Sequence, residues 1–125
     1  MSRDRLFFAL GALFGGLAVA AGAFGAHALR DQLAPDRLAQ FELAVRYQMY
    51  HALALIATGY AAQRWPASTA NAAGWAFVIG ILIFCGTVYA LAFGSPRWFG
   101  AITPIGGIAL IGGWALLVYS AVRGD

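Results

Sequence analysis

Four long, mostly apolar stretches dominate the pattern of the chain, at about 6–27, 44–63, 72–93 and 103–122. A helix of about 20 residues spans roughly 30 Å, the thickness of the hydrocarbon core of a bilayer. Such a helix satisfies its own backbone polar groups, as lipid requires. The pattern therefore predicts an all-α integral membrane protein, an antiparallel bundle of four transmembrane helices in one domain that covers residues 1–125. Thr103 and Pro104 suit the cap and first turn of the fourth helix.

The first connection is the only extended polar one. Apolar residues recur there at spacings of three and four, which is typical of an amphipathic helix: Leu38, Phe41, Val45 and Met49. We predict an amphipathic segment over about 35–46 that begins along the membrane surface and runs, straight or bent, into the second span. A separate surface helix followed by a turn is the alternative.

A secretory signal peptide is an alternative interpretation of the first span. Arginines near the start, an apolar run and the small-residue stretch at 26–28 resemble its three parts. The uncharged run from Leu6 to Ala26 is longer than the roughly 7–15 residues of a signal-peptide core. We therefore expect a retained transmembrane helix.

Composition and charge support a membrane location. Hydrophobic residues make up 62% of the chain and charged residues only 10%, against about 25% charged in soluble domains. The basic residues are all arginine and are scattered singly, so no basic patch indicates nucleic acid. We expect a multi-pass protein of the bacterial inner (plasma) membrane, with membrane lipids as partners.

The arginines do not decide the orientation. The four-span topology places Arg3, Arg5, Arg64 and Arg123 on one side and Arg30, Arg37, Arg46 and Arg97 on the other. With four arginines on each side, the positive-inside rule does not choose an orientation. The first helix usually dominates the orientation, which slightly favours a cytoplasmic N-terminus.

Small residues line one face of the first span and recur in the fourth. The first set follows a 4-3-4-3 spacing, and such faces allow helices to approach closely. The predicted packing positions are Gly11, Gly15, Ala18, Gly22 and Gly25, followed by Gly106, Gly107, Gly112 and Gly113. Packing within one bundle explains them, and so does association with a second copy or with another membrane protein; we expect a homo-oligomer or such a heteromeric partner.

Polar side chains gather near one predicted end of the bundle, where the first and third connections lie together. We predict a hydrogen-bonded interface cluster that closes this end, made of His27, Tyr47, His51, Tyr89 and Thr103. The alternative is a bundle that binds a cofactor, a lipid or a small molecule, or relays protons, through the two histidines. Their spacing and the lack of nearby carboxylates support no metal site, and we predict no cofactor.

No catalytic arrangement is visible in the sequence. Cys85 stands in an apolar stretch, where packing is the favoured role. The acids Asp31, Asp36 and Glu42 all lie in the first connection, outside the spans. We therefore predict no catalytic residues and a non-enzymatic structural or assembly component of the membrane.

Four blocks carry a family resemblance: GAFGAHAL (22–29), RYQMYHALAL (46–55), FCGTVYALAF (84–93) and ITPIGGIALIGGW (102–114). In this order they resemble the blocks of the domain-of-unknown-function 423 family, small bacterial inner-membrane proteins with transmembrane relatives in animals. The resemblance implies a four-span membrane protein without an established activity. It marks the following motif positions without giving them a role: His27, Tyr47, His51, Tyr89, Thr103, Pro104, Gly106 and Gly107.

Overall fold

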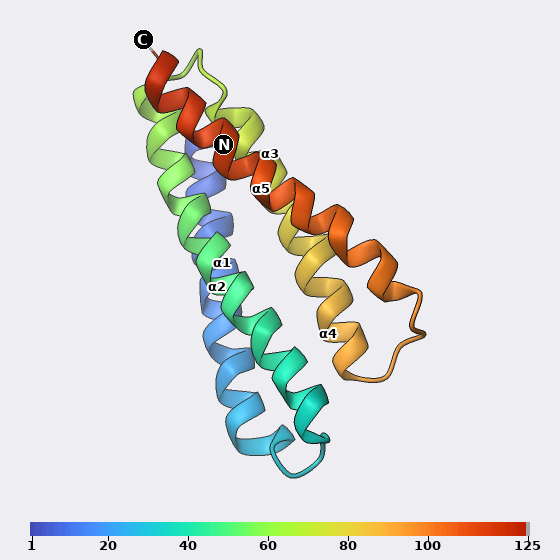
Figure 1. Cartoon of the computed structure of the whole chain (residues 1–125). Helices are drawn as coiled ribbons and strands as arrows, with labels where there is room; N and C mark the ends of the chain where they lie inside the picture. Colours follow the sequence, from blue (N-terminus) through green and yellow to red (C-terminus); the bar gives the residue numbers. More distant parts are fainter. Residues whose placement is uncertain (125) are drawn as a thin grey trace.

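The chain forms two antiparallel helical hairpins in the computed structural model, which describes residues 1–124 (Figure 1). In the first hairpin, α1 (Arg3–Phe24) continues into the π-helical turn η1 (Gly25–Leu29), and α2 (Pro35–Arg64) returns beside it. In the second, α3 (Ala70–Gly80), the π-helical turn η2 (Ile81–Cys85) and α4 (Gly86–Ala92) form one continuous rod. The last helix, α5 (Phe99–Arg123), packs along this rod.

The described residues are helical throughout apart from short connections, which confirms the all-α prediction. Three helical stretches are long and apolar enough to cross a membrane: Arg3–Leu29, Ala70–Ala92 and Phe99–Arg123. The connection between α2 and α3 lies at the same end as the start of α1 and the end of α5, and the other two connections both lie toward the opposite end (Figure 1).

Residues 35–46 and the second predicted span belong to one helix. Pro35 occupies the first turn of α2, where its missing N–H removes no helical bond. The helix then continues without a break for 30 residues, about 45 Å. The apolar stripe explains this continuity, because Phe41 and Ala44 of the amphipathic segment are buried like the residues that follow.

The start of α5 differs from the sequence expectation. The helix begins at Phe99, and Pro104 lies inside it, so Thr103 and Pro104 are not its cap and first turn. The hydroxyl of Thr103 instead donates to the carbonyl of Phe99 over 3.2 Å. This carbonyl is not the one affected by Pro104, whose missing N–H would have donated to the carbonyl of Gly100, four residues earlier.

The turn between α4 and α5 begins with a glycine cap. Gly94 has a φ of 92°, a conformation that side chains disfavour. Its N–H donates to the carbonyl of Leu91, and the N–H of Ser95 donates to that of Ala90. This is the Schellman arrangement, which satisfies the last carbonyls of a helix.

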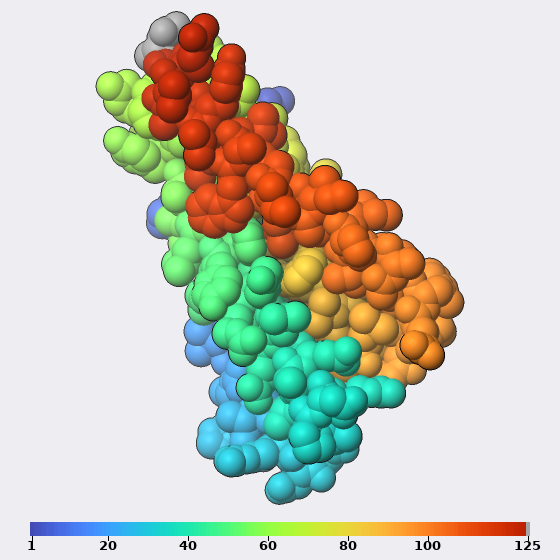
Figure 2. Space-filling model, viewed as in Figure 1, coloured from blue at the N-terminus to red at the C-terminus, as the bar shows by residue number. Residues whose placement is uncertain are grey.

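The main core lies where the hairpins meet, with α2 at the centre. It includes Phe7, Leu55, Phe77, Cys85 and Leu110, which come from five different elements. Helix α2 packs along α1 and also contacts the α3–α4 rod and α5. In the space-filling view, side chains of the α3–α4 rod fill the region between α2 and α5 (Figure 2).

Candidate functional site: the buried polar side chains of α2

One face of α2 carries a stripe of buried positions with steps of three and four residues. It runs through Phe41, Ala44, Gln48, His51, Leu55, Thr58 and Ala62. Gln48 and His51 are only 7% and 5% exposed. A buried polar group is costly unless it is hydrogen-bonded, so the partners of these two side chains define what they do.

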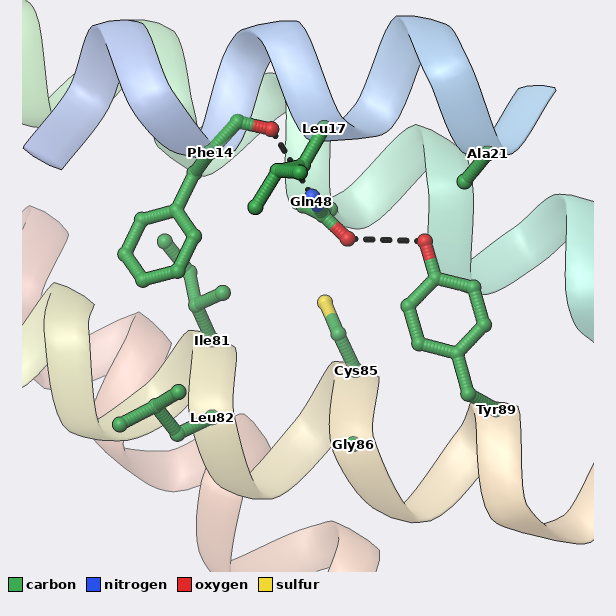
Figure 3. A pocket seen from close by; sticks show the side chains of 9 residues that line it. All are labelled: Phe14, Leu17, Ala21, Gln48, Ile81, Leu82, Cys85, Gly86 and Tyr89. Atoms are coloured by element: carbon green, nitrogen blue, oxygen red, sulfur yellow. Dashed lines mark hydrogen bonds between the residues drawn. The ribbon is translucent and has the colours of Figure 1, made fainter. Parts of the chain in front are cut away.

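Gln48 joins three helices (Figure 3). Its Nε2 donates to the backbone carbonyl of Phe14 in α1 over 2.8 Å. Its Oε1 accepts from the hydroxyl of Tyr89 in α4, also over 2.8 Å. One amide therefore bonds both neighbours of α2 on this side.

His51 joins α2 to α5. Nε1 of Trp114 donates to Nε2 of His51 over 3.0 Å, and Nδ1 of His51 lies 2.7 Å from the carbonyl oxygen of Tyr47. Because an indole N–H only donates and a carbonyl only accepts, Nε2 is the unprotonated nitrogen and Nδ1 carries the hydrogen. The imidazole is thus held in one neutral tautomer with both nitrogens engaged.

A third polar contact lies between α4 and α5. The hydroxyl oxygens of Thr87 and Thr103 are 2.7 Å apart. Thr87 also lies 2.7 Å from the carbonyl oxygen of Ile83, one turn earlier in its own helix. This pair closes the second hairpin independently of Gln48 and His51.

The structure does not bring the five predicted cluster residues together. Tyr47 bonds His51, Tyr89 bonds Gln48, and Thr103 bonds Thr87, so they form three separate sets. His27 lies in η1 with its side chain exposed. Gly25, two residues before His27, lies against the ring of Phe41, which precedes His51 in α2 by ten residues, about 15 Å of helix. The two histidines therefore lie at different levels of the bundle.

The small residues of α1 face α2 within the same chain. A Cβ added at Gly11 would lie 2.6 Å from the carbonyl oxygen of Ala52, and one at Gly25 would lie 2.7 Å from the ring of Phe41. Gly15 and Gly22 have looser contacts, of 3.8 and 3.4 Å at the nearest, to Ala52 and Val45. A second copy cannot reach this face without displacing α2.

The glycines of α5 behave in the same way against the α3–α4 rod. A Cβ at Gly106 would overlap the backbone of Phe84, and one at Gly113 would lie 2.7 Å from the ring of Phe77. Gly107 is less tightly placed, 3.8 Å from the ring of Phe84. Close packing inside the chain therefore accounts for the tightest of the predicted glycine positions.

Sequence reasoning missed Gln48 and Trp114. Gln48 stands seven residues from both Phe41 and Leu55, so continuing the apolar stripe of α2 at heptad spacing would have predicted its burial. Trp114 lies in the middle of the fourth predicted span, away from the interfaces that tryptophan prefers. An indole N–H at that depth in a membrane needs a partner, but nothing in the sequence says that the partner is His51.

Apolar helices of membrane-spanning length, joined by hydrogen bonds between buried polar side chains, define a multi-pass α-helical membrane protein. The chain belongs to the family described as "Protein of unknown function (DUF423)", whose model matches residues 21–107. This confirms the resemblance seen in the sequence.

Named relatives are bacterial membrane proteins. The chain is 43% identical to the UPF0382 membrane protein SH2409 of Staphylococcus haemolyticus, over 95% of this chain and 97% of the relative. It is 38% identical to the UPF0382 membrane protein YwdK of Bacillus subtilis, over 95% of this chain and 98% of the relative. No solved structure matches.

Proposed function

We propose that the protein is a non-enzymatic structural component of the membrane, built from four spans with α2 as the central one. Helix α2 packs along α1, and a helix beside a spanning helix over its whole length crosses the same bilayer. The outer face of α2 supports this, because Tyr50, Leu53 and Tyr60 are each more than half exposed. Apolar side chains exposed at these positions suit lipid.

The hydrogen bonds of Gln48 and His51 are the observation that supports a structural role. Gln48 bonds α1 and α4, while His51 bonds α5. A histidine that acts as a general base or a metal ligand needs a free lone pair on a ring nitrogen. In His51 that lone pair, on Nε2, accepts a hydrogen bond from the indole of Trp114. These side chains therefore serve to hold the two hairpins together.

Site-directed labelling tests the four-span topology. In a Cys85→Ser background, which removes the single cysteine, new cysteines at Gln32, Ala67 and Arg97 probe the three connections. We expect an impermeant thiol reagent to reach positions 32 and 97 from one side and position 67 from the other. Labelling of positions 32 and 97 from opposite sides would contradict the four-span topology. Such a result would mean that α2 lies on the membrane surface and does not cross the bilayer.

Spectroscopy and metal analysis test the non-enzymatic role. The purified full-length protein is expected to have no visible absorption band and no stoichiometric metal. A haem spectrum or one bound metal per chain would overturn the proposal, and loss of that signal in His51→Gln would locate the ligand.

A further inference from the structure

A groove with a volume of about 470 Å³ lies between the start of α1 and the end of α2. This volume is within the range of small-molecule sites, about 300–1,000 Å³. We call it the α1–α2 groove. Its lining comes from the first two turns of α1 and from the last turns of α2: Asp4, Arg5 and Phe8, with Ile56, Ala57, Gly59, Tyr60 and Gln63.

The two helices are in backbone contact at Gly59. A Cβ added there would lie 2.8 Å from the carbonyl oxygen of Asp4 and 3.3 Å from the amide nitrogen of Phe8. Phe8 and Tyr60 are 55% and 63% exposed, so the groove opens outward from the bundle. A ligand could therefore enter it from the membrane without moving either helix.

The lining is polar at the ends of the helices and apolar further in. Asp4 and Arg5 lie in the first turn of α1, and Gln63 is the second-last residue of α2. Phe8 follows Asp4 by about one turn, and Ile56 lies seven residues before Gln63, about 10 Å deeper. On the four-span topology proposed above, these helix ends lie at a membrane surface. The groove thus has the order of a membrane lipid, with polar groups at the surface and apolar groups below.

The polar end carries one charge of each sign. Asp4 and Arg5 are adjacent, and adjacent residues on a helix do not face each other, so each can bind a ligand group of its own. The helix dipole favours the anionic form of a carboxylate in the first turn. Arg64 lies over the ring of Trp65, 5.8 Å from its centroid, and Arg5 is the only cation among the described residues that line the groove.

These charges select among lipid headgroups. A phosphate is complementary to the guanidinium of Arg5, which can donate two parallel hydrogen bonds to it. A headgroup with no charge beyond its phosphate would leave Asp4 beside an anion, whereas an ammonium on the same headgroup would pair with the carboxylate. A primary ammonium also donates charge-assisted hydrogen bonds to a carboxylate, which a quaternary ammonium cannot do because it has no N–H.

We propose that the α1–α2 groove binds one zwitterionic phospholipid whose headgroup carries a primary ammonium, as phosphatidylethanolamine does. The phosphate accepts from Arg5, the ammonium donates to Asp4, and one acyl chain lies along Phe8 and Ile56. This site rests on the four-span topology proposed above, because it needs these ends of α1 and α2 at a membrane surface. It adds a specific lipid ligand to the structural role.

Photolabelling in vesicles tests the site. The full-length protein is reconstituted in phosphatidylcholine with a small fraction of a phospholipid that carries a diazirine in one acyl chain, and labelled peptides are identified by mass spectrometry. Three probes differ only in their heads, which are ethanolamine, choline and glycerol. We expect the ethanolamine probe to label position 8 and positions 56–60 about two- to fivefold more than the other two, the factor that an exposed ion pair provides.

Single charge changes identify the groups that bind the head. Asp4→Asn removes the partner of the ammonium, so the ethanolamine probe should then label no more than the choline probe. Arg5→Gln should lower the labelling by all three probes, because all three carry the phosphate. Arg3→Gln is the matched control: it removes the same charge from the same turn of α1, but Arg3 does not line the groove, and this variant should label like the wild type.

Filling the groove tests the place of the acyl chain. Ala57→Trp, at an exposed position of the lining, should lower the labelling of these peptides by every probe. Ala23→Trp, at an exposed position near the other end of α1, should leave it unchanged. Equal labelling by the ethanolamine and choline probes, equal effects of Arg3→Gln and Arg5→Gln, or unchanged labelling of Ala57→Trp would overturn the proposal. The cysteine labelling of the three connections uses no lipid probe, so a failure of this proposal would leave the four-span topology standing.

Discussion

At the scale of single residues, the stability of this protein depends on polar atoms that lipid cannot solvate. The indole of Trp114 and the imidazole of His51 are each other's partners across 63 positions of sequence. Removing one partner leaves the other unsatisfied, which costs about 1–3 kcal/mol. Removing both side chains is expected to lower the free energy of unfolding by less than the sum of the two single losses.

A double-mutant cycle measures this coupling. His51→Leu is expected to lower the free energy of unfolding by about 1–3 kcal/mol, because the Trp114 N–H loses its acceptor. In a Trp114→Phe background the same change should cost markedly less. His51→Gln, which keeps a donor and an acceptor, should be milder than His51→Leu. The measurement is equilibrium unfolding in mixed micelles, and strictly additive losses would show that the bond contributes nothing.

His27 provides a contrast with His51. Its side chain is exposed on η1, and surface changes away from special features stay within about 0.5 kcal/mol. We expect His27→Leu and His27→Gln to unfold like the wild type. If substitutions at His27 lowered the free energy of unfolding as much as those at His51, a ligand shared by the two histidines would be favoured over separate structural roles.

At the scale of elements, the glycine face of α1 sets how closely the first hairpin packs. Without a hydrophobic force between helices in lipid, close contact is a main source of association. Gly11 and Gly25 have no room for a side chain, so α2 can approach the backbone of α1 there.

Paired substitutions on α1 test this packing. Gly11→Leu should lower the free energy of unfolding by about 1–3 kcal/mol or more, because its Cβ would collide with the backbone of α2. Gly16→Leu is the matched control: it lies in the same helix, five residues on, and its Cβ would meet nothing within 4 Å. Similar thermal stability of the two variants would contradict the proposed role of this face.

At the scale of the whole molecule, two hairpins meet along α2, and the polar bonds of Gln48 and His51 cross the boundary between them. The connection between the hairpins is short, from Trp65 to Thr69, and lies at one end of the bundle, whereas Gln48 and His51 lie near the middle of α2. The contacts rather than the connection should therefore hold the hairpins together.

A divided chain tests this inference. Residues 1–66 and 67–125, co-expressed with an affinity tag on the first part, are expected to copurify from detergent. Combining Gln48→Leu with His51→Leu should reduce the recovered second part, because the two bonds that these side chains make between the hairpins, to Tyr89 and Trp114, are lost. A Gly16→Leu first part serves as the control. Unchanged recovery in the double variant would show that apolar packing alone joins the hairpins.

The sequence by itself determined the membrane class, the helical class and the order of the elements, because hydropathy and the positions of polar connections are local properties of the chain. It also marked Gly11, Gly25, Gly106 and Gly113 as sites of close contact, since small residues at regular spacing have few other uses in lipid. The hydrogen bonds between polar side chains were not determined in this way. His51, Tyr89 and Thr103 could be nominated, but their partners could not.

Only the tertiary structure decided those partners. Whether His51 meets His27 or Trp114 depends on how far α2 extends and on how each helix is rotated about its axis. These quantities result from packing between residues such as Gly11 and Ala52, which are distant in sequence. The stripe that holds Gln48 is visible in the sequence, but its bonds to Phe14 and Tyr89 exist only because α2 lies between α1 and α4.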